Sequence, residues 1–267
     1  GNTKAINNLA VLYENEYKDF EKAERFYLLA IEKGNVRSIN NLGLLYYKKM
    51  KDYVKAQKYF ELAIEKGFPF ANINLGLLFQ NEYKNFEKAE AYYLKAIAAG
   101  AKKAYYYLGS LYQNSFHDYR KAESFYQKAV EEGDMQAMYH LGFLYQNKLK
   151  EYDKAEECYK VSAGAGNPDA MNNLAIIYKN QYKDFVNAEK YYLEAVEKEH
   201  EIAMHNLALL YQHDLNRPDE AEKYYLMTLE RGNYAAAYNL GVLYEDYLDD
   251  VINAEKYLMK ASDKGHN

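Results

Sequence analysis

The sequence contains no tryptophan, only three prolines and a single cysteine, Cys158. One cysteine excludes an intramolecular disulfide and a zinc site built on several cysteines. No apolar run approaches the roughly 18 residues that a membrane-spanning helix needs. No basic and apolar leader opens the chain. We therefore expect no membrane insertion and no signal peptide in this stretch, which leaves the compartment open and slightly favours the cytoplasm.

An excess of positive charge is also missing. The formal net charge is −5 and the isoelectric point is near 5.8, whereas nucleic-acid-binding domains usually carry a basic patch. The chain is instead rich in tyrosine, with 32 among 267 residues, and 49% of its residues are hydrophobic. This composition is typical of a globular protein, and it predicts no nucleic-acid partner.

A strict internal repeat dominates the sequence. Four sets of residues recur at intervals of 33 with no insertion or deletion: a leucine, the small residue that follows it, an aromatic residue and an alanine. The leucine set is Leu9, Leu42, Leu75, Leu108, Leu141, Leu174, Leu207 and Leu240, and the alanine set is Ala23, Ala56, Ala89, Ala122, Ala155, Ala188, Ala221 and Ala254. Repeats of this length indicate an array of small helical units.

Each period contains two amphipathic segments. In the second period, Ile39, Leu42 and Leu45 lie at helical spacing and predict a helix over residues 36–48. Ala56 and Phe60 belong to a second apolar stripe that predicts a helix over residues 53–66. One helix pair cannot bury its apolar faces alone, so neighbouring pairs are expected to stack and share a continuous core.

Residues that start or stop helices agree with these boundaries. Pro69 and Pro168 fall at the expected start of a first helix and Pro218 at the start of a second, where proline is tolerated. Aspartate or asparagine precedes most second helices as an expected cap: Asp19, Asp52, Asn85, Asp118, Asp184 and Asp250. Glycine ends them, where a left-handed residue is favoured: Gly34, Gly67, Gly100, Gly133, Gly166, Gly232 and Gly265. Glu199 is the exception, and we expect its turn to be strained or differently shaped.

The residues of this period resemble those of a known family. The pattern N-L-G-x-L-Y, then K-A-E-x-Y-Y, then A-I-E-K-G, as in residues 41–46 and 88–93, resembles Sel1-like repeats of the tetratricopeptide-like class. The period of 33 is closer to tetratricopeptide repeats, since Sel1-like units are usually longer. The resemblance implies one all-α domain, a right-handed superhelical solenoid of eight helix-turn-helix repeats over residues 1–267. The expected units are 3–35, 36–68, 69–101, 102–134, 135–167, 168–200, 201–233 and 234–266.

The same resemblance places a ligand-binding face on the first helices. The position before the repeated leucine is expected to face the groove, and it holds asparagine in six of eight repeats. An amide both donates and accepts hydrogen bonds, so the row could bind a peptide backbone. Alternatively, each amide pairs with a neighbouring helix and fixes the geometry of the repeats. The row consists of Asn8, Asn41, Asn74, Tyr107, His140, Asn173, Asn206 and Asn239.

In the middle of the chain aromatic residues replace this row. Tyr106, Tyr107, Tyr139 and His140 are either a contact site, since tyrosine is common in interface hot spots, or rings that pack against each other. Further candidates for the groove are Gln80, Gln113, Gln146 and Gln212.

Positive charge is expected near the groove edge. Lys4, Arg37 and Lys103 supply it, and the first two, with Asn8 and Asn41, resemble part of a clamp for a terminal carboxylate. By contrast, the recurrent Lys88 and Glu90 of the second helix are expected on a solvated outer face.

No catalytic or metal-binding constellation is expected. His200 and His205 are five residues apart, whereas a zinc-protease helix needs a spacing of four. Cys158 occupies an aromatic position of the repeat and is expected to be a small buried residue. We therefore expect no cofactor and no enzyme activity.

The sequence thus predicts a protein-interaction scaffold that binds a peptide or partner protein. Sel1-like proteins are common as bacterial adaptors, host-interaction factors and toxin-neutralising partners, so the resemblance implies such a setting. The alternative is an assembly module that self-associates through uncapped solenoid ends. It rests on Tyr257 and Leu258 in the last helix, which are expected to lack a following unit to cover them.

Overall fold

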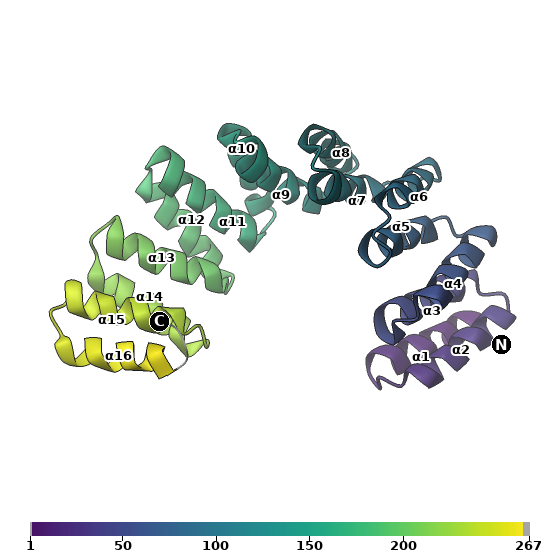
Figure 1. Ribbon diagram of the computed structural model, residues 1–267, viewed down its shortest axis with the longest axis horizontal. Coiled ribbons are helices and arrows are strands. Elements are labelled where there is room, and N and C mark those ends of the chain that lie inside the picture. Colours follow the sequence, from purple (N-terminus) through teal and green to yellow (C-terminus); the bar gives the residue numbers. More distant parts are fainter. Residues whose placement is uncertain (1, 264–267) are drawn as a thin grey trace. The chain divides into compact units, whose positions relative to one another are not determined.

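The protein is described by a computed structural model, which covers residues 2–263. It divides into two compact units, Gly1–Ala137 and Met138–Asn267. The first unit is built from helices that alternate along the chain and pack in successive pairs (Figure 1). They are α1 (Thr3–Asn15), α2 (Phe20–Glu32), α3 (Val36–Leu45), α4 (Tyr53–Glu65), α5 (Ala71–Asn81), α6 (Phe86–Ala98), α7 (Ala104–Leu111) and α8 (Tyr119–Glu131).

The second unit repeats this arrangement, and α9 (Met135–Leu144) carries the chain into it. Its further helices are α10 (Tyr152–Gly164), α11 (Pro168–Ile177), α12 (Phe185–Glu197), α13 (Glu201–His213), α14 (Pro218–Glu230), α15 (Ala235–Asp246) and α16 (Val251–Asp263). Residues 2–263 contain no strand. None of their helices is long and apolar enough to cross a membrane. The predicted all-α class is therefore confirmed.

Four of the first helices end in a way that the sequence did not predict, with a wider π-helical turn. The helix expected over residues 36–48 is α-helical only to Leu45, and a π-helical turn, Tyr46–Met50, follows. Lys51 then takes a left-handed conformation with φ of 58°. The same π turn and left-handed residue follow α7, α9 and α11. This turn reverses the chain without glycine. The second helix α4 begins two residues after the left-handed Lys51.

Most predicted caps are confirmed. Asp19, Asp52, Asn85, Asp118, Asp184 and Asp250 each accept a hydrogen bond from the backbone N–H three residues on. Pro168 and Pro218 occupy the first turns of α11 and α14 as expected. The expectation for Pro69 was wrong by two residues, since α5 begins at Ala71. It lies in the turn before α5, where its carbonyl oxygen accepts a hydrogen bond from the Asn72 side chain.

In most pairs the core is formed by an aromatic ring on the second helix that lies against the small residue after the repeated leucine. Tyr93 is fully buried in this way. A Cβ atom added to Gly76 would lie only 2.6 Å from Tyr93 Cδ1. Phe60 lies against Gly43 in the same manner. At these two positions glycine therefore allows the close approach of the two helices.

Successive pairs are joined by a repeated hydrogen bond. In five repeats, the tyrosine at the end of the first helix or in the π turn after it donates its hydroxyl hydrogen bond to a glutamate of the preceding second helix. Tyr112 donates in this way to Glu90, and burial together with this bond raises the pKa of Tyr112 to about 12. The prediction that Glu90 lies on a solvated outer face was therefore wrong, whereas Lys88 is exposed as expected. The other pairs are Tyr46–Glu24, Tyr178–Glu156, Tyr211–Glu189 and Tyr244–Glu222.

The expectation for Tyr257 and Leu258 was also wrong. Tyr257 is buried and stacks on Tyr244, with ring centroids 5.5 Å apart. Leu258 is half-buried and packs against Gly241. Both side chains point back into their own pair because they occupy the aromatic positions of the repeat.

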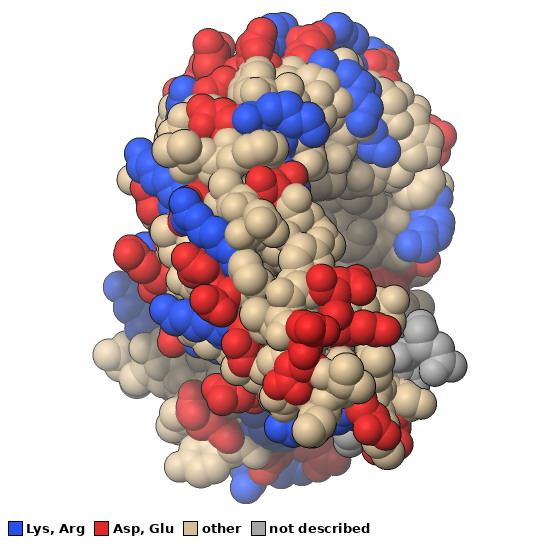
Figure 2. Space-filling view, turned by 90° about the vertical axis from the view of Figure 1, so that its left-hand side faces the viewer, with Lys and Arg blue, Asp and Glu red and all other residues tan. Residues whose placement is uncertain are grey.

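The outer surface of the second helices carries mixed charge. Figure 2 shows lysine and arginine side chains lying among aspartate and glutamate side chains on the face that it draws. An ion pair one helical turn apart, Lys190–Glu194, is part of this pattern. Exposed pairs of this kind contribute little to stability, typically about 0.3–0.5 kcal/mol.

Glu199 adopts the turn that glycine makes elsewhere. Its φ is +60°, and its N–H donates to Val196 O at 2.8 Å, as the N–H of Gly34 donates to Ile31 O. The turn therefore keeps the usual shape. It is strained, because a residue with a side chain costs about 1 kcal/mol in the left-handed region.

We expect Glu199→Gly to raise the free energy of unfolding by about 1 kcal/mol, because it removes this strain. Urea denaturation followed by circular dichroism measures the change. The reverse substitution Gly67→Glu, at the same position of another repeat, should destabilise the protein. A loss of stability in Glu199→Gly would mean that the Glu199 side chain has a stabilising role.

Candidate functional site

The predicted asparagine row lies on the first helices, and several of its amides join neighbouring first helices within each unit. Asn41 Nδ2 donates to Asn7 Oδ1 at 3.0 Å, and Asn74 Nδ2 donates to Asn40 Oδ1 at 2.7 Å. In the second unit, Asn206 Nδ2 donates to Asn172 Oδ1 at 2.9 Å. The amides therefore fix the spacing of neighbouring repeats, which was one of the two alternatives for this row.

The side-chain NH2 groups of these amides are used in this way, but their carbonyl oxygens are not. Within residues 2–263, none of the groups described donates a hydrogen bond to Oδ1 of Asn41, Asn74, Asn206 or Asn239. These side chains are half-buried, and Asn8 is exposed. Each amide thus presents a carbonyl oxygen at a partly desolvated position, where a hydrogen bond from a ligand N–H would be stronger than in water.

An aliphatic row accompanies the amides, and the sequence reasoning missed it. It lies three residues after the amide position, so both rows share one face of each first helix. Every member is half-buried. Its aliphatic members are Val11, Leu44 and Leu77 in the first unit and Ile176, Leu209 and Val242 in the second, and Ser110 and Phe143 interrupt the row. Its period of 33 was the available signal, although its residue type varies.

In the first unit, Tyr106 and Tyr107 form part of an aromatic cluster. Their ring centroids are 5.3 Å apart in an edge-on arrangement, and Tyr107 stacks on Tyr93 at 5.7 Å. Tyr106 lies 6.0 Å from Tyr126. Both rings are half-buried. They therefore pack against each other, as one of the two alternatives states, and keep part of their surface exposed.

In the second unit, Tyr139 and His140 are arranged in a similar way. Their rings meet edge-on at 5.2 Å, and Tyr139 lies 6.0 Å from Tyr159. The Tyr139 hydroxyl accepts a hydrogen bond from Asn173 Nδ2 at 3.4 Å. Tyr139 thus takes the place of the asparagine that accepts this bond in other repeats.

Three of the four glutamines predicted for the groove accept hydrogen bonds from core tyrosines. Gln80, Gln146 and Gln212 accept hydrogen bonds from the hydroxyl groups of Tyr93, Tyr159 and Tyr225 at 2.7–2.8 Å. Gln113 is buried, and its Oε1 atom has no hydrogen-bond partner among the residues described. Gln113 and Gln212 are buried and do not line an open groove, whereas Gln80 and Gln146 are half-buried, and their place in the groove stays a prediction.

Three of the four residues of the predicted carboxylate clamp lie together. Lys4, Asn8 and Arg37 line a hollow of about 530 Å³ in the first unit, where the helices α1 and α3 begin. Neither cation makes an ion pair within residues 2–263. Asn41 does not line this hollow, and Lys103 lines a different one beside Glu132 and Asp134.

His205 occupies the position of Asn40 and Asn172, and burial lowers its pKa. Its Nε2 atom lies 3.4 Å from Asn239 Nδ2, and its Nδ1 atom has no partner among the described groups. Because the folded state disfavours the charged imidazole, the unfolded chain binds a proton first as the pH falls. This site therefore contributes its full stability above a pH of about 6.5 and loses it as the pH falls below that value.

We expect the thermal midpoint of His205→Asn to fall less than that of the wild-type protein between neutral and mildly acidic pH. Asparagine cannot gain a proton, and it supplies the acceptor that Asn172 supplies to Asn206. Differential scanning calorimetry at several pH values measures the difference. Parallel curves for the two proteins would show that His205 does not titrate on unfolding.

The other residues considered for chemistry have structural roles. Cys158 is buried, which raises its pKa to about 12 and keeps the thiol protonated. His200 caps α13 by accepting a hydrogen bond from the Ala203 N–H at 3.0 Å, and Asp169 lies 3.1 Å from its other ring nitrogen. A search of residues 2–263 finds no cluster of three or more His, Cys, Asp or Glu that could hold a metal ion.

Paired helices, side-by-side first helices and a polar and aliphatic face along them define the class of protein. It is an α-solenoid of the kind that mediates protein–protein interactions.

The chain belongs to the Sel1 repeat family. The Sel1 repeat matches residues 3–35, 69–100, 102–134, 168–200 and 235–266, which is more than half of the chain. Tetratricopeptide repeats match residues 36–65, 136–161 and 202–233. A search of curated proteins finds no match.

Solved structures of similar fold include two Sel1-type proteins. One is c5321, a protective antigen present in uropathogenic Escherichia coli strains, with 24% identity and a TM-score of 0.66. The comparison covers 98% of this chain and 62% of c5321, so the chain spans less than two thirds of that protein. The other is a Sel1 repeat protein from Oxalobacter formigenes, with 21% identity, a TM-score of 0.67, and coverage of 99% and 84%.

A third similar structure is YrrB, described as a tetratricopeptide-repeat protein with an unusual peptide-binding site. The identity is 26% and the TM-score 0.51, over 65% of this chain and 92% of YrrB.

Proposed function

We propose that the chain is a binding scaffold that takes a segment of a partner protein along the face of its first helices. The observation that carries this proposal is the pairing of two rows on that face. Half-buried aliphatic side chains lie one turn from amides whose oxygens accept no hydrogen bond from the residues described. Catalysis is not part of the proposal, and neither is a cofactor.

The chemistry of the two rows suits a polypeptide. The aliphatic row, such as Leu44 and Leu77, can bury apolar side chains of a partner, while the Asn41 and Asn74 oxygens accept backbone N–H groups. The edges of Tyr106 and Tyr107 add amphipathic surface of the kind common in interfaces. Tyr139 and His140 offer the same in the second unit, beside Asn173.

The hollow at Lys4 favours an acidic or carboxyl-terminal group at one end of the bound segment. Lys4 and Arg37 are unpaired cations there, and Asn8 supplies an amide. A carboxylate accepts charge-assisted hydrogen bonds from such groups. Asn41 lies outside this hollow, so the proposed clamp consists of three residues.

Two similar proteins are in accord with the proposal. YrrB is described as binding a peptide, and c5321 as a protective antigen of uropathogenic bacteria. We therefore include in the proposal a bacterial setting in which the partner is a host or bacterial protein.

The test is capture of binding proteins from a lysate of the source organism. We expect Leu44→Glu with Leu77→Glu to lose a partner that the wild-type chain retains, because two charges would be buried in the interface. The matched control is Val54→Glu with Leu94→Glu on the second helices, at exposed positions of the same unit. Circular dichroism first establishes that both variants are helical. A partner lost only in the control pair would contradict the proposal.

Self-association through the end of the array is the alternative, and one observation bears on it. Ile252 on α16 is 82% exposed, but Val54 and Val186 at the same position of inner repeats are 76% and 77% exposed. This apolar exposure is therefore a property of the repeat and gives no special support to assembly. Sedimentation at two protein concentrations tests for self-association, because self-association would raise the measured mass at the higher concentration.

A further inference from the structure

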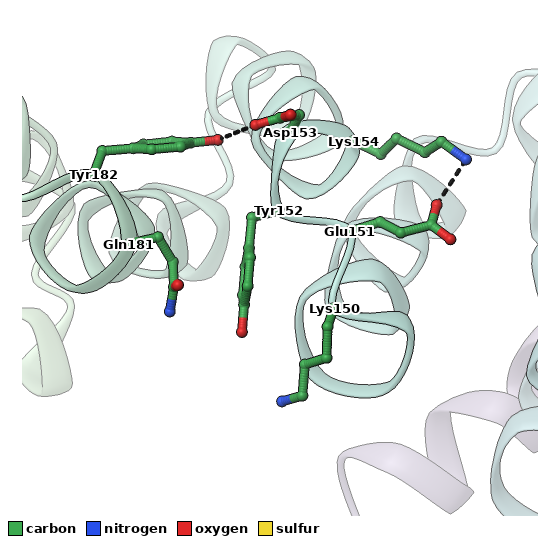
Figure 3. A pocket seen from close by; sticks show the side chains of 7 residues that line it. All are labelled: Lys150, Glu151, Tyr152, Asp153, Lys154, Gln181 and Tyr182. Carbon is green, nitrogen blue, oxygen red and sulfur yellow. Dashed lines mark hydrogen bonds and ion pairs between the residues drawn. The ribbon is translucent and has the colours of Figure 1, made fainter.

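A polar hollow in the second unit is lined by residues other than those of the proposed binding face. It has a volume of about 580 Å³ and lies between the loop before α10 and the end of the π turn after α11. Figure 3 shows the side chains that line it. They are Lys150, Glu151, Tyr152, Asp153, Lys154, Gln181 and Tyr182.

The acidic side chains of this hollow already have partners. Asp153 Oδ1 accepts a hydrogen bond from the Tyr182 hydroxyl at 2.7 Å, and Glu151 forms an ion pair with Lys154 at 2.7 Å. These two interactions neutralise Glu151 and satisfy one oxygen of Asp153. They hold the walls of the hollow in place.

Three donors are left without such partners. Lys150 makes no ion pair and Tyr152 and Gln181 make no side-chain hydrogen bond with the residues described. Their side chains point to the same open side in Figure 3, whereas the Lys154–Glu151 and Tyr182–Asp153 pairs are directed away. An ammonium, a phenol and an amide thus meet at one opening, and a carboxylate can accept hydrogen bonds from all three.

The second and third repeats contain the matching residues and show what is different here. Tyr53 corresponds to Tyr152 and Lys51 to Lys150, but glutamate occupies the position of Gln181, at Glu82. Tyr53 donates its hydroxyl hydrogen bond to Glu82, and this bond is the main cause of its raised pKa. In the second unit the amide of Gln181 replaces that carboxylate. The hydroxyl that Tyr53 uses within the chain therefore remains available at Tyr152.

We propose that Lys150, Tyr152 and Gln181 form a second binding site, which takes an aspartate or glutamate side chain from an acidic segment of a partner protein. The ligand carboxylate replaces the one that Glu82 provides to Tyr53. Its size fits the hollow, and its charge complements the unpaired Lys150. This site lies on other residues than the first-helix face, so it stands or fails independently of the function proposed above.

The test uses the whole chain and the peptide acetyl-Gly-Glu-Glu-Gly-amide, followed by nuclear magnetic resonance of labelled protein. We expect this peptide to shift the signals of Lys150, Tyr152 and Gln181, and its neutral analogue acetyl-Gly-Gln-Gln-Gly-amide to leave them unchanged. Lys150→Met should weaken binding by about tenfold or more, since it removes a hydrogen bond to a charged group. Lys51→Met, the matched control, should bind as the wild-type protein does.

Three results would overturn the proposal. They are the absence of shifts at Lys150 and Tyr152, equal shifts with the neutral peptide, and equal binding by Lys150→Met. The binding of free glutarate is measured in the same way as that of the peptide. If it binds as tightly as the peptide, the site recognises a small dicarboxylate, and the protein segment proposed as its occupant is wrong. Because Lys150 is exposed, its replacement is expected to leave the fold intact, which circular dichroism checks.

Discussion

Replacement of Tyr93 by alanine is expected to lower the free energy of unfolding by about 3–5 kcal/mol, the range for large aromatic side chains in a core. Tyr93 is fully buried, stacks on Tyr107 and fills the space that Gly76 leaves open. Its hydroxyl also donates to Gln80 Oε1 at 2.8 Å. Urea denaturation followed by circular dichroism measures the loss.

Two further variants show which part of the ring matters. Tyr93→Phe keeps the packing and removes only the hydrogen bond, so it should cost about 1 kcal/mol. Tyr238→Ala removes a tyrosine that is 49% exposed, and it should change stability by less than about 0.5 kcal/mol. Similar losses for Tyr93→Ala and Tyr238→Ala would contradict the packing described for each helix pair.

Replacement of Asn7 by alanine is expected to cost about 1–3 kcal/mol, because it leaves buried polar groups unpaired. Asn7 Oδ1 accepts from Ser38 Oγ at 2.9 Å and from Asn41 Nδ2 at 3.0 Å. Ser38 is fully buried, so bulk solvent cannot replace this partner. The effect should be strongest in α1, which these bonds join to α3, and amide hydrogen exchange should show it as faster exchange there.

Asn8 provides the control for Asn7. It is exposed, and its Oδ1 atom takes part only in a 3.4 Å hydrogen bond from Asn7 Nδ2. Asn8→Ala should therefore leave the exchange of α1 nearly unchanged. Equal effects of the two substitutions would show that loss of helix-surface polarity, and not the joint between repeats, causes the change.

The sequence predicted the helix pairs and most of their ends because those features recur every 33 residues. Capping by Asp52 and the turn at Gly67 depend only on neighbouring residues, so a local pattern is enough to predict them. The π turn after Leu45 was not predicted. It depends on how the hydrogen bonds of the last turn are shared, and the side chains of Tyr46–Met50 carry no distinct signal for it.

The candidate site was only partly predictable. The asparagine row was found from its period, but its acceptors lie one position earlier, where the residue type varies among Asn7, Asn40, Tyr139 and His205. Periodicity alone does not reveal such a varied row. The role of Glu90 was missed because a glutamate on an amphipathic helix resembles a solvated residue until the neighbouring repeat places Tyr112 against it.

The central claim, that the first helices carry the binding face, is tested most directly by site-specific photo-crosslinking in a lysate of the source organism. A photoreactive amino acid is placed at Leu44 or Ile176 on the first helices, and at Lys58 or Lys190 on the exposed side of the second helices. The account predicts that a partner protein is crosslinked from Leu44 or Ile176 and not from the two lysine positions. Crosslinks to a partner from Lys58 or Lys190 alone would contradict it.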